Sequence, residues 1–305
     1  MLNIGIIGIT EVLEPHVKRI RKNKNVNVIG KASVGTSEQL NGFHFSIPEF
    51  NRIELIERSD VLLVDNSSSL PFDMLCDIVR KSKHIFTTEY SNLSVEECAQ
   101  LVKLANESGS VIQVSSPFYY TAAIQWLNDA ISFPLFLDVS KFAANINMYE
   151  TLYPLFLMLS DITGISPKKV GVSAFESAQN ERNFLNVRLE FGDASVVNLN
   201  FSNQFLLDKF VIKVYSKDKF VSLDFNKKIF HFNNSKIDLS DYLTVNEFDA
   251  FVETIEHGTQ KSSNIEDFLA AMQLVESIEK KSYNLQLSKS YKKLLLPQYF
   301  FLLIV

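Results

Sequence analysis

The feature that most constrains the fold is a strand–helix–strand pattern at the start of the chain. A short apolar run at residues 2–9 is followed by a helical pattern at about residues 11–22. A second apolar run follows at residues 26–30. Two strands joined by a helix within about 30 residues form a βαβ unit. At the start of a chain of 305 residues, such a unit is typical of a dinucleotide-binding domain.

The turn after the first strand departs from the usual dinucleotide fingerprint. In that fingerprint, G-x-G-x-x-G, the second glycine lets backbone approach the pyrophosphate and the third lets helix and strand pack closely. Gly8 can supply the first position, but Thr10 and Leu13 stand at the second and third. The acidic residue that holds the ribose is also missing, because the second strand ends between Lys31 and Ser33. The sequence therefore indicates the fold more clearly than the cofactor.

Composition is that of an ordinary globular protein. The chain is 46% hydrophobic and 21% charged, and its net charge of −5 disfavours a general nucleic-acid or anionic-membrane role. Cys76 and Cys98 lie on apolar faces of expected helices, which predicts buried free thiols in a reducing, cytoplasmic setting. A segment that spans a bilayer needs about 20 residues, and the apolar tail at residues 294–305 is shorter than that. We therefore expect this tail to be a final strand or a docking segment.

Strands and helices alternate in the first part of the chain. The expected strands beyond the opening unit are at residues 60–65, 84–88 and 111–114, and the expected helices at 53–58, 72–81 and 95–108. Ser94 and Glu97 form a capping-box pattern at the start of the third of these helices. This alternation predicts a parallel, doubly wound sheet.

The pattern changes near Pro117 to strands with alternating apolar residues. The expected strands are at residues 135–142, 170–174, 186–191, 195–201, 210–215 and 220–225, and the expected helices at 121–131, 149–163, 245–256 and 264–281. Hairpins of this kind build a mixed or antiparallel sheet with helices on one face. We therefore predict two domains, a Rossmann-like α/β domain at 1–117 and an α+β domain at 118–305. An open sheet face and an apolar tail favour a homo-oligomer through the C-terminal sheet.

In order and spacing these segments resemble the Gfo/Idh/MocA oxidoreductases, named for glucose–fructose oxidoreductase and inositol dehydrogenase. Residues 3–8 with His16 are similar to the opening of that family, and residues 83–86 followed by 93–98 are the most specific local match. Residues 247–251 resemble a helix of the family's second domain. The resemblance covers nearly the whole chain. It implies an NAD(P) cofactor and hydride transfer on a sugar-like or polyol substrate.

Two catalytic motifs of that family are altered in this chain. The E-K-P motif of that family falls on residues 88–90, or on residues 89–91 with a one-residue shift, and neither register has a lysine. The histidine of the second motif falls on Pro154. Proline has no proton to transfer, and proton transfer needs a titratable group within hydrogen-bond reach of the substrate. Two functions therefore stay open, and with them whether the chain is an enzyme. One is an NAD(P)-dependent oxidoreductase acting on CH–OH groups, and the other is an inactive relative that binds a ligand or partner.

Candidate site residues lie where strands end or near the domain boundary. Glu89 and Tyr90 are candidate catalytic residues, because tyrosine can serve as an acid where its pKa is lowered. Tyr119 and Tyr120 are candidate substrate contacts. Local structure, or packing in the case of Tyr119 and Tyr120, is the more common explanation of such residues. The candidate cofactor contacts are Gly8, Ile9, Thr10, Ser33, Asn66, Ser67 and Glu89.

The remaining polar residues refine these expectations. Lys31 and Ser33 would suit a 2′-phosphate better than a free hydroxyl, which favours NADP over NAD if either binds. His16 is expected to be a packing residue of the first helix. The other histidines are scattered and not at ligand spacing, so no metal site is predicted.

Overall fold

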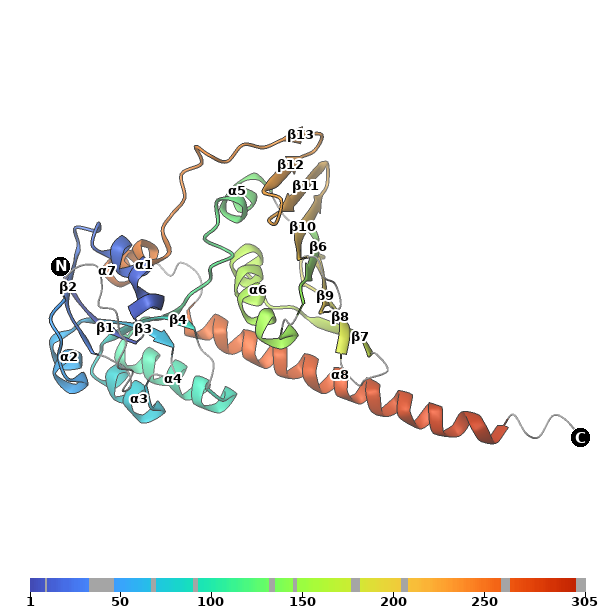
Figure 1. Ribbon diagram of the computed structural model, residues 1–305, viewed down its shortest axis with the longest axis horizontal. Coiled ribbons are helices and arrows are strands. Elements are labelled where there is room, and N and C mark those ends of the chain that lie inside the picture. The colour runs from blue at the N-terminus through green and yellow to red at the C-terminus, as the bar shows by residue number, and fades with distance from the viewer. Residues whose placement is uncertain are drawn as a thin grey trace, which may run out of the picture. The chain divides into compact units, whose positions relative to one another are not determined.

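A computed structural model describes residues 1–8, 10–32, 47–66, 70–89, 93–131, 135–144, 147–176, 182–203, 208–258 and 264–299 (Figure 1). The chain divides into two compact units. The first comprises Met1–Tyr120 and Thr244–Ala270, and the second comprises Thr121–Leu243 and Ala271–Val305.

The first unit is built on a parallel sheet with the strand order β2-β1-β3-β4-β5. Its strands are β1 (Leu2–Ile7), β2 (Val26–Ala32), β3 (Val61–Asn66), β4 (His84–Glu89) and β5 (Ile112–Val114). Consecutive buried apolar residues in β1 and β3 explain why helices must cover both faces of this sheet. In Figure 1, α1 (Thr10–Ile20) and α7 (Glu247–His257) lie on one side, and α2 (Arg52–Arg58), α3 (Phe72–Arg80) and α4 (Val95–Ser108) lie on the other. The predicted parallel, doubly wound sheet is therefore confirmed.

The short segment at residues 48–50 runs beside β2 and adds a further member to this edge of the sheet. Lys31 forms a parallel bridge with Glu49, and its N–H donates to the carbonyl of Pro48 over 2.9 Å. A Cβ atom at Gly30 would lie 2.3 Å from the Phe50 ring, so only glycine lets this segment approach. Counting the segment as the third strand gives the strand order 3-2-1-4-5-6 of dinucleotide-binding folds.

Helix α4 begins and ends as its sequence predicts. The Glu97 N–H donates to Ser94 Oγ over 3.1 Å, and the Ser94 N–H donates to Glu97 Oε2 over 2.8 Å. Gly109 ends the helix with a φ of 71°, a conformation that glycine adopts without strain. The helix buries Cys98 on its apolar face, and Cys76 of α3 is also buried, so both are free thiols inside the first unit. Burial raises the pKa of the Cys98 thiol to about 12.

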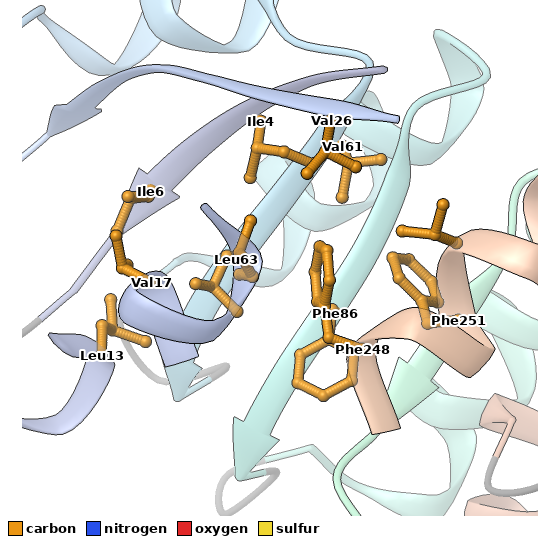
Figure 2. Close-up of a cluster of buried hydrophobic side chains, with 12 residues drawn as sticks. Ile4, Ile6, Leu13, Val17, Val26, Val61, Leu63, Phe86, Phe248 and Phe251 are labelled. Atoms are coloured by element: carbon orange, nitrogen blue, oxygen red, sulfur yellow. The ribbon is translucent and has the colours of Figure 1, made fainter. Parts of the chain in front are cut away.

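Helix α7 corrects the expected division of the chain. A boundary near Pro117 assigns this helix to the second domain, whereas the structure packs it into the core of the first unit. Figure 2 shows Phe248 and Phe251 of α7 facing Phe86 of β4. The centroid of the Phe86 ring lies 5.6 Å from that of Phe248 and 5.5 Å from that of Phe251. The position of an amphipathic helix along the chain does not reveal which sheet will bury its apolar face.

The second unit contains an eight-stranded mixed sheet in the order β13-β12-β11-β10-β6-β9-β8-β7. Its strands are β6 (Phe136–Phe142), β7 (Lys169–Glu176), β8 (Arg182–Glu190), β9 (Val196–Ser202), β10 (Lys209–Ser216), β11 (Lys219–Asp224), β12 (Ile229–Phe232) and β13 (Ser235–Lys236). The predicted hairpins appear as β8–β9 and β10–β11, and β6 pairs with β9 in parallel. The last two strands, β12 and β13, are an addition to the sequence-based prediction.

One face of this sheet is covered and the other is open. Along β10, Phe210, Ile212 and Val214 are buried, whereas Lys213 and Tyr215 are exposed. The helices assigned to this part of the chain are α5 (Ala122–Ala130) and α6 (Met148–Thr163), together with most of α8 (Ile265–Tyr299). In Figure 1, α6 lies along one face of the sheet, as the alternating pattern predicts.

The C-terminal segment differs from the expected strand. Helix α8 continues to Tyr299, so residues 294–299 are helical, and residues 300–305 lie outside the described part. None of the helices within the described residues combines the length and the apolar character that crossing a membrane requires.

The aromatic contact between α7 and β4 yields a prediction about stability. Phe251→Ala should lower the free energy of unfolding by about 3–5 kcal/mol, because it removes a fully buried ring and leaves a cavity. Chemical denaturation of the full chain measures the change. Val245→Ala, at a half-exposed position just before the helix, is the control and should have little effect. Equal effects of the two substitutions would contradict the burial of α7 in this core.

Candidate functional site

The carboxyl ends of β1, β3 and β4 form the first part of the candidate site. The connection from β1 to β2 passes through α1 on one side of the sheet, and the connection from β2 to β3 passes through α2 on the other. In open α/β sheets, ligands bind at such a switch point, outside the carboxyl ends of the strands. The structure brings Gly8, Asn66 and Glu89 to this edge, where Asn66 and Glu89 are partners in register. Their roles as cofactor or catalytic residues stay predictions.

Gly8 has no room for a side chain. Its φ of 138° is a conformation that residues with a side chain rarely adopt. A Cβ atom at this position would lie 2.2 Å from Cγ of Asp65 and 2.3 Å from its Oδ1. Asp65 is only 4% exposed, so its carboxyl group is packed against the start of the loop that leads into α1. The glycine is therefore required by a contact within the chain.

The loop after β1 does not fit a dinucleotide pyrophosphate in the way that the full fingerprint does. An acidic group lies beside Gly8, and like charges close together repel. Leu13, at the third glycine position, is fully buried in the core cluster shown in Figure 2. Thr10, at the second position, is the first residue of α1. The first glycine is therefore present, and the side chain of Asp65 fills the space beside it.

A cleft of about 960 Å³ forms the second part of the candidate site, and all its lining residues belong to the first unit. This volume lies within the usual range for small-molecule sites, about 300–1,000 Å³. The cleft is bounded by α1, by the carboxyl ends of β4 and β5, and by the start of α7. The lining residues are His16, Arg19, Lys22, Asn23, Thr88, Ser115, Pro117, Tyr120, Thr244, Val245, Asn246, Glu247 and Asp249.

Of the two predicted substrate contacts, only Tyr120 lines this cleft. Tyr119 packs edge-on against Tyr120, with ring centroids 5.1 Å apart. Both tyrosines belong to the first unit, just before the chain enters the second.

Glu247 is the residue of the cleft with the most unusual environment. It is the first residue of α7, and its carboxyl group accepts hydrogen bonds from the Ser115 hydroxyl over 2.9 Å and from the Ser116 N–H. Burial raises the pKa of the Glu247 carboxyl to about 7, although these hydrogen bonds and the charge of Arg19 act to lower it. A carboxyl group that titrates near neutral pH in a cleft is suited to accept or donate a proton.

Sequence reasoning did not single out Glu247 as a candidate site residue. An acidic residue directly after the N-cap, here Asn246, is common in helices and does not indicate a site. Only the folding of α7 onto the ends of β4 and β5 brings the residue into the cleft.

His16 both packs in the core and lines the cleft. Its ring is tilted against Phe86, with ring centroids 6.2 Å apart, which agrees with the expected packing role. Burial, together with the positive charge of Arg19, lowers the pKa of His16 and so favours the neutral ring. Arg19 and Lys22 supply positive charge to the lining of the cleft, and Asp249 supplies negative charge. Oδ1 of Asp249 accepts a hydrogen bond from Asn23 over 2.6 Å.

Several predicted site residues lie outside the described part of the structure. Ile9, Ser33, Ser67 and Tyr90 are among them. Pro154, on which the resemblance places the family histidine, lies inside α6 of the second unit. Within the residues that the structure describes, no group of three or more His, Cys, Asp or Glu side chains could hold a metal ion.

The environment of Glu247 yields a prediction about pH. The folded protein keeps a proton on this carboxyl between about pH 4.5 and 7, whereas the unfolded chain has already lost it. The free energy of unfolding should therefore fall across this range, by up to about 3 kcal/mol from this group. Glu247→Gln should flatten that pH dependence in denaturant melts. Glu256→Gln, at the exposed end of the same helix, should keep the pH dependence of the wild type. Identical pH profiles for the two variants would contradict the assignment of this dependence to Glu247.

Comparisons with known proteins place the fold. No family model matches the chain, and no curated protein matches it. Among solved structures, UDP-N-acetylglucosamine 3-dehydrogenase from Acidithiobacillus ferrooxidans is similar at 15% identity, with a TM-score of 0.76 over 92% of this chain and 97% of that chain. A dehydrogenase from Clostridium difficile has 14% identity and a TM-score of 0.76 over 92% and 99%. A putative myo-inositol dehydrogenase from Sinorhizobium meliloti has 15% identity and a TM-score of 0.68 over 92% and 98%. The chain therefore has the two-domain fold of these dehydrogenases, which is the fold that its resemblance to the Gfo/Idh/MocA oxidoreductases implies.

Proposed function

We propose that the chain is an oxidoreductase of the Gfo/Idh/MocA type. Its reaction, where it is active, is NAD(P)-dependent hydride transfer on a CH–OH group of a sugar-like or polyol substrate. The observation that carries this proposal is the likeness of fold to dehydrogenases over at least 92% of this chain and 97% of theirs. Two of these relatives are described as acting on a nucleotide sugar and on myo-inositol. The polar cleft at the carboxyl edge of the first sheet is of a suitable size for such a ligand.

NADP is the favoured cofactor within this proposal. Lys31 lies near the end of β2, the strand whose end carries a ribose-binding carboxylate in NAD-dependent folds. A cationic side chain there suits a 2′-phosphate better than a free hydroxyl.

A second candidate function is supported by the environment of Gly8. A relative that binds a small polar ligand without hydride transfer has no need for a pyrophosphate contact at that loop. The carboxyl group of Asp65 packed against Gly8 favours this candidate. So does proline at the position of the family histidine, since Pro154 cannot transfer a proton.

A thermal-shift titration of the full chain with NAD, NADH, NADP and NADPH separates the two candidates. A cofactor at about 100 times its dissociation constant should stabilise the folded protein by about 2.7 kcal/mol. Inorganic pyrophosphate at matched ionic strength is the control for nonspecific anion effects. Under the first candidate, NADP or NADPH should raise the melting temperature, and Thr10→Gly should enlarge the shift. No shift with any of the four would defeat the first candidate and favour the second.

We also propose that the open face of the second-unit sheet binds a second copy of this chain. Phe136 and Tyr215 on that face are 37% and 44% exposed, and their ring centroids are 5.9 Å apart. Aromatic side chains are enriched at protein interfaces relative to the rest of the surface. Tyr215→Glu should reduce the molecular mass measured by light scattering. Leu243→Glu, which alters an apolar residue 92% exposed outside the sheet, should leave it unchanged. A monomeric wild-type chain would contradict the proposal.

A further inference from the structure

Asp65 lies directly across the switch point from Gly8. Strands β1 and β3 are neighbours, and Ile7 is the register partner of Val64. The next residue on each strand is therefore level with the other, and these residues are Gly8 and Asp65. Helix α1 begins two residues after Gly8, at Thr10. The N-terminus of a helix at this point of the fold is where a dinucleotide's phosphates bind, because its free N–H groups attract anions.

The side chain of Asp65 is built into the end of the sheet. It is 4% exposed, and its Oδ1 and Oδ2 lie 2.3 and 2.6 Å from the position of a Cβ atom at Gly8. The backbone carbonyl of Asp65 accepts a hydrogen bond from the Thr88 hydroxyl, which ties the end of β3 to β4. The neighbouring residues of β3, from Val61 to Val64, are fully buried. The acid is therefore held in a fixed place.

We infer that Asp65 is an internal substitute for the cofactor phosphate: its side chain occupies the anion position beside Gly8 and weakens the binding of a dinucleotide there. Two effects act together. The side chain takes up space next to the loop, and its acidic group opposes the approach of a second anion. The inference concerns the cofactor of the proposed function and so rests on that function's dinucleotide-type site.

A ribose-binding role does not explain Asp65. In dinucleotide-binding folds, the carboxylate that holds the ribose stands at the end of the second strand, about 20 residues after the glycine-rich turn. Asp65 stands at the end of β3 instead, on the other side of β1 from β2. Its contact is with the glycine itself, where the turn begins.

Three variants of the full chain separate charge from size. Asp65→Asn removes the acid and keeps its volume, and Asp65→Ala removes both. Asp73→Asn is the matched control, because it removes one acid from an exposed position in the first turn of α3. Binding of NADH and NADPH is measured by fluorescence titration and by thermal shift, with circular dichroism to establish folding. We expect each Asp65 variant to bind at least one cofactor about tenfold more tightly than the wild type. The control should match the wild type.

The outcomes distinguish this inference from the proposed function. The wild-type titration tests whether the chain uses a dinucleotide, and the ratio of variant to wild type tests Asp65. Tight binding by the wild type with no gain in the variants would overturn the inference and leave the proposed function standing. A gain in the variants over a wild type that does not bind would support the inference and defeat the proposed function. Folded variants that bind no cofactor would overturn the inference. If Asp65→Ala does not fold, Asp65→Asn, which keeps the packing against Gly8, decides the question.

Discussion

The packing of aromatic rings around Phe86 holds the first unit together. Phe86 lies on β4, and its ring packs against His16 of α1 and against Phe248 and Phe251 of α7. Because this contact joins two helices and the sheet, it fixes how the residues at the sheet's carboxyl edge lie. The cleft is bounded by α1 and by the start of α7, the two helices whose rings pack against Phe86. At the start of α7, the carboxyl group of Glu247 accepts hydrogen bonds from Ser115 and Ser116.

Much of the fold follows from local pattern. Runs such as residues 61–64 are apolar on both faces, and only a parallel sheet covered on both sides can bury them. Ser94, Glu97 and Gly109 mark the ends of α4 by chemistry that acts within a few residues. The placement of α7 could not be predicted in this way. Its apolar face would suit either sheet, and the choice depends on contacts with residues that lie far away in the sequence, such as Phe86.

The candidate site was less predictable than the fold, because it depends on those long-range contacts. Gly8, Asn66 and Glu89 could be placed from the sequence, since parallel strands end at a common edge. Glu247 could not, because its unusual protonation comes from burial against a distant strand end. From the sequence alone, Asp65 is only a polar residue at the end of an expected strand. Its significance depends on the neighbouring strand, which sets it level with a glycine that has no room for a side chain.

The return of residues 244–270 to the first unit has a consequence for how the protein is made. A ribosome synthesises the whole segment Thr121–Leu243 before the residues that complete the first core emerge. Until Phe248 and Phe251 have left the exit tunnel, the ring of Phe86 lacks its contacts with α7. The nascent N-terminal sheet therefore presents an uncovered aromatic surface during much of translation, and such a surface is a natural binding site for chaperones.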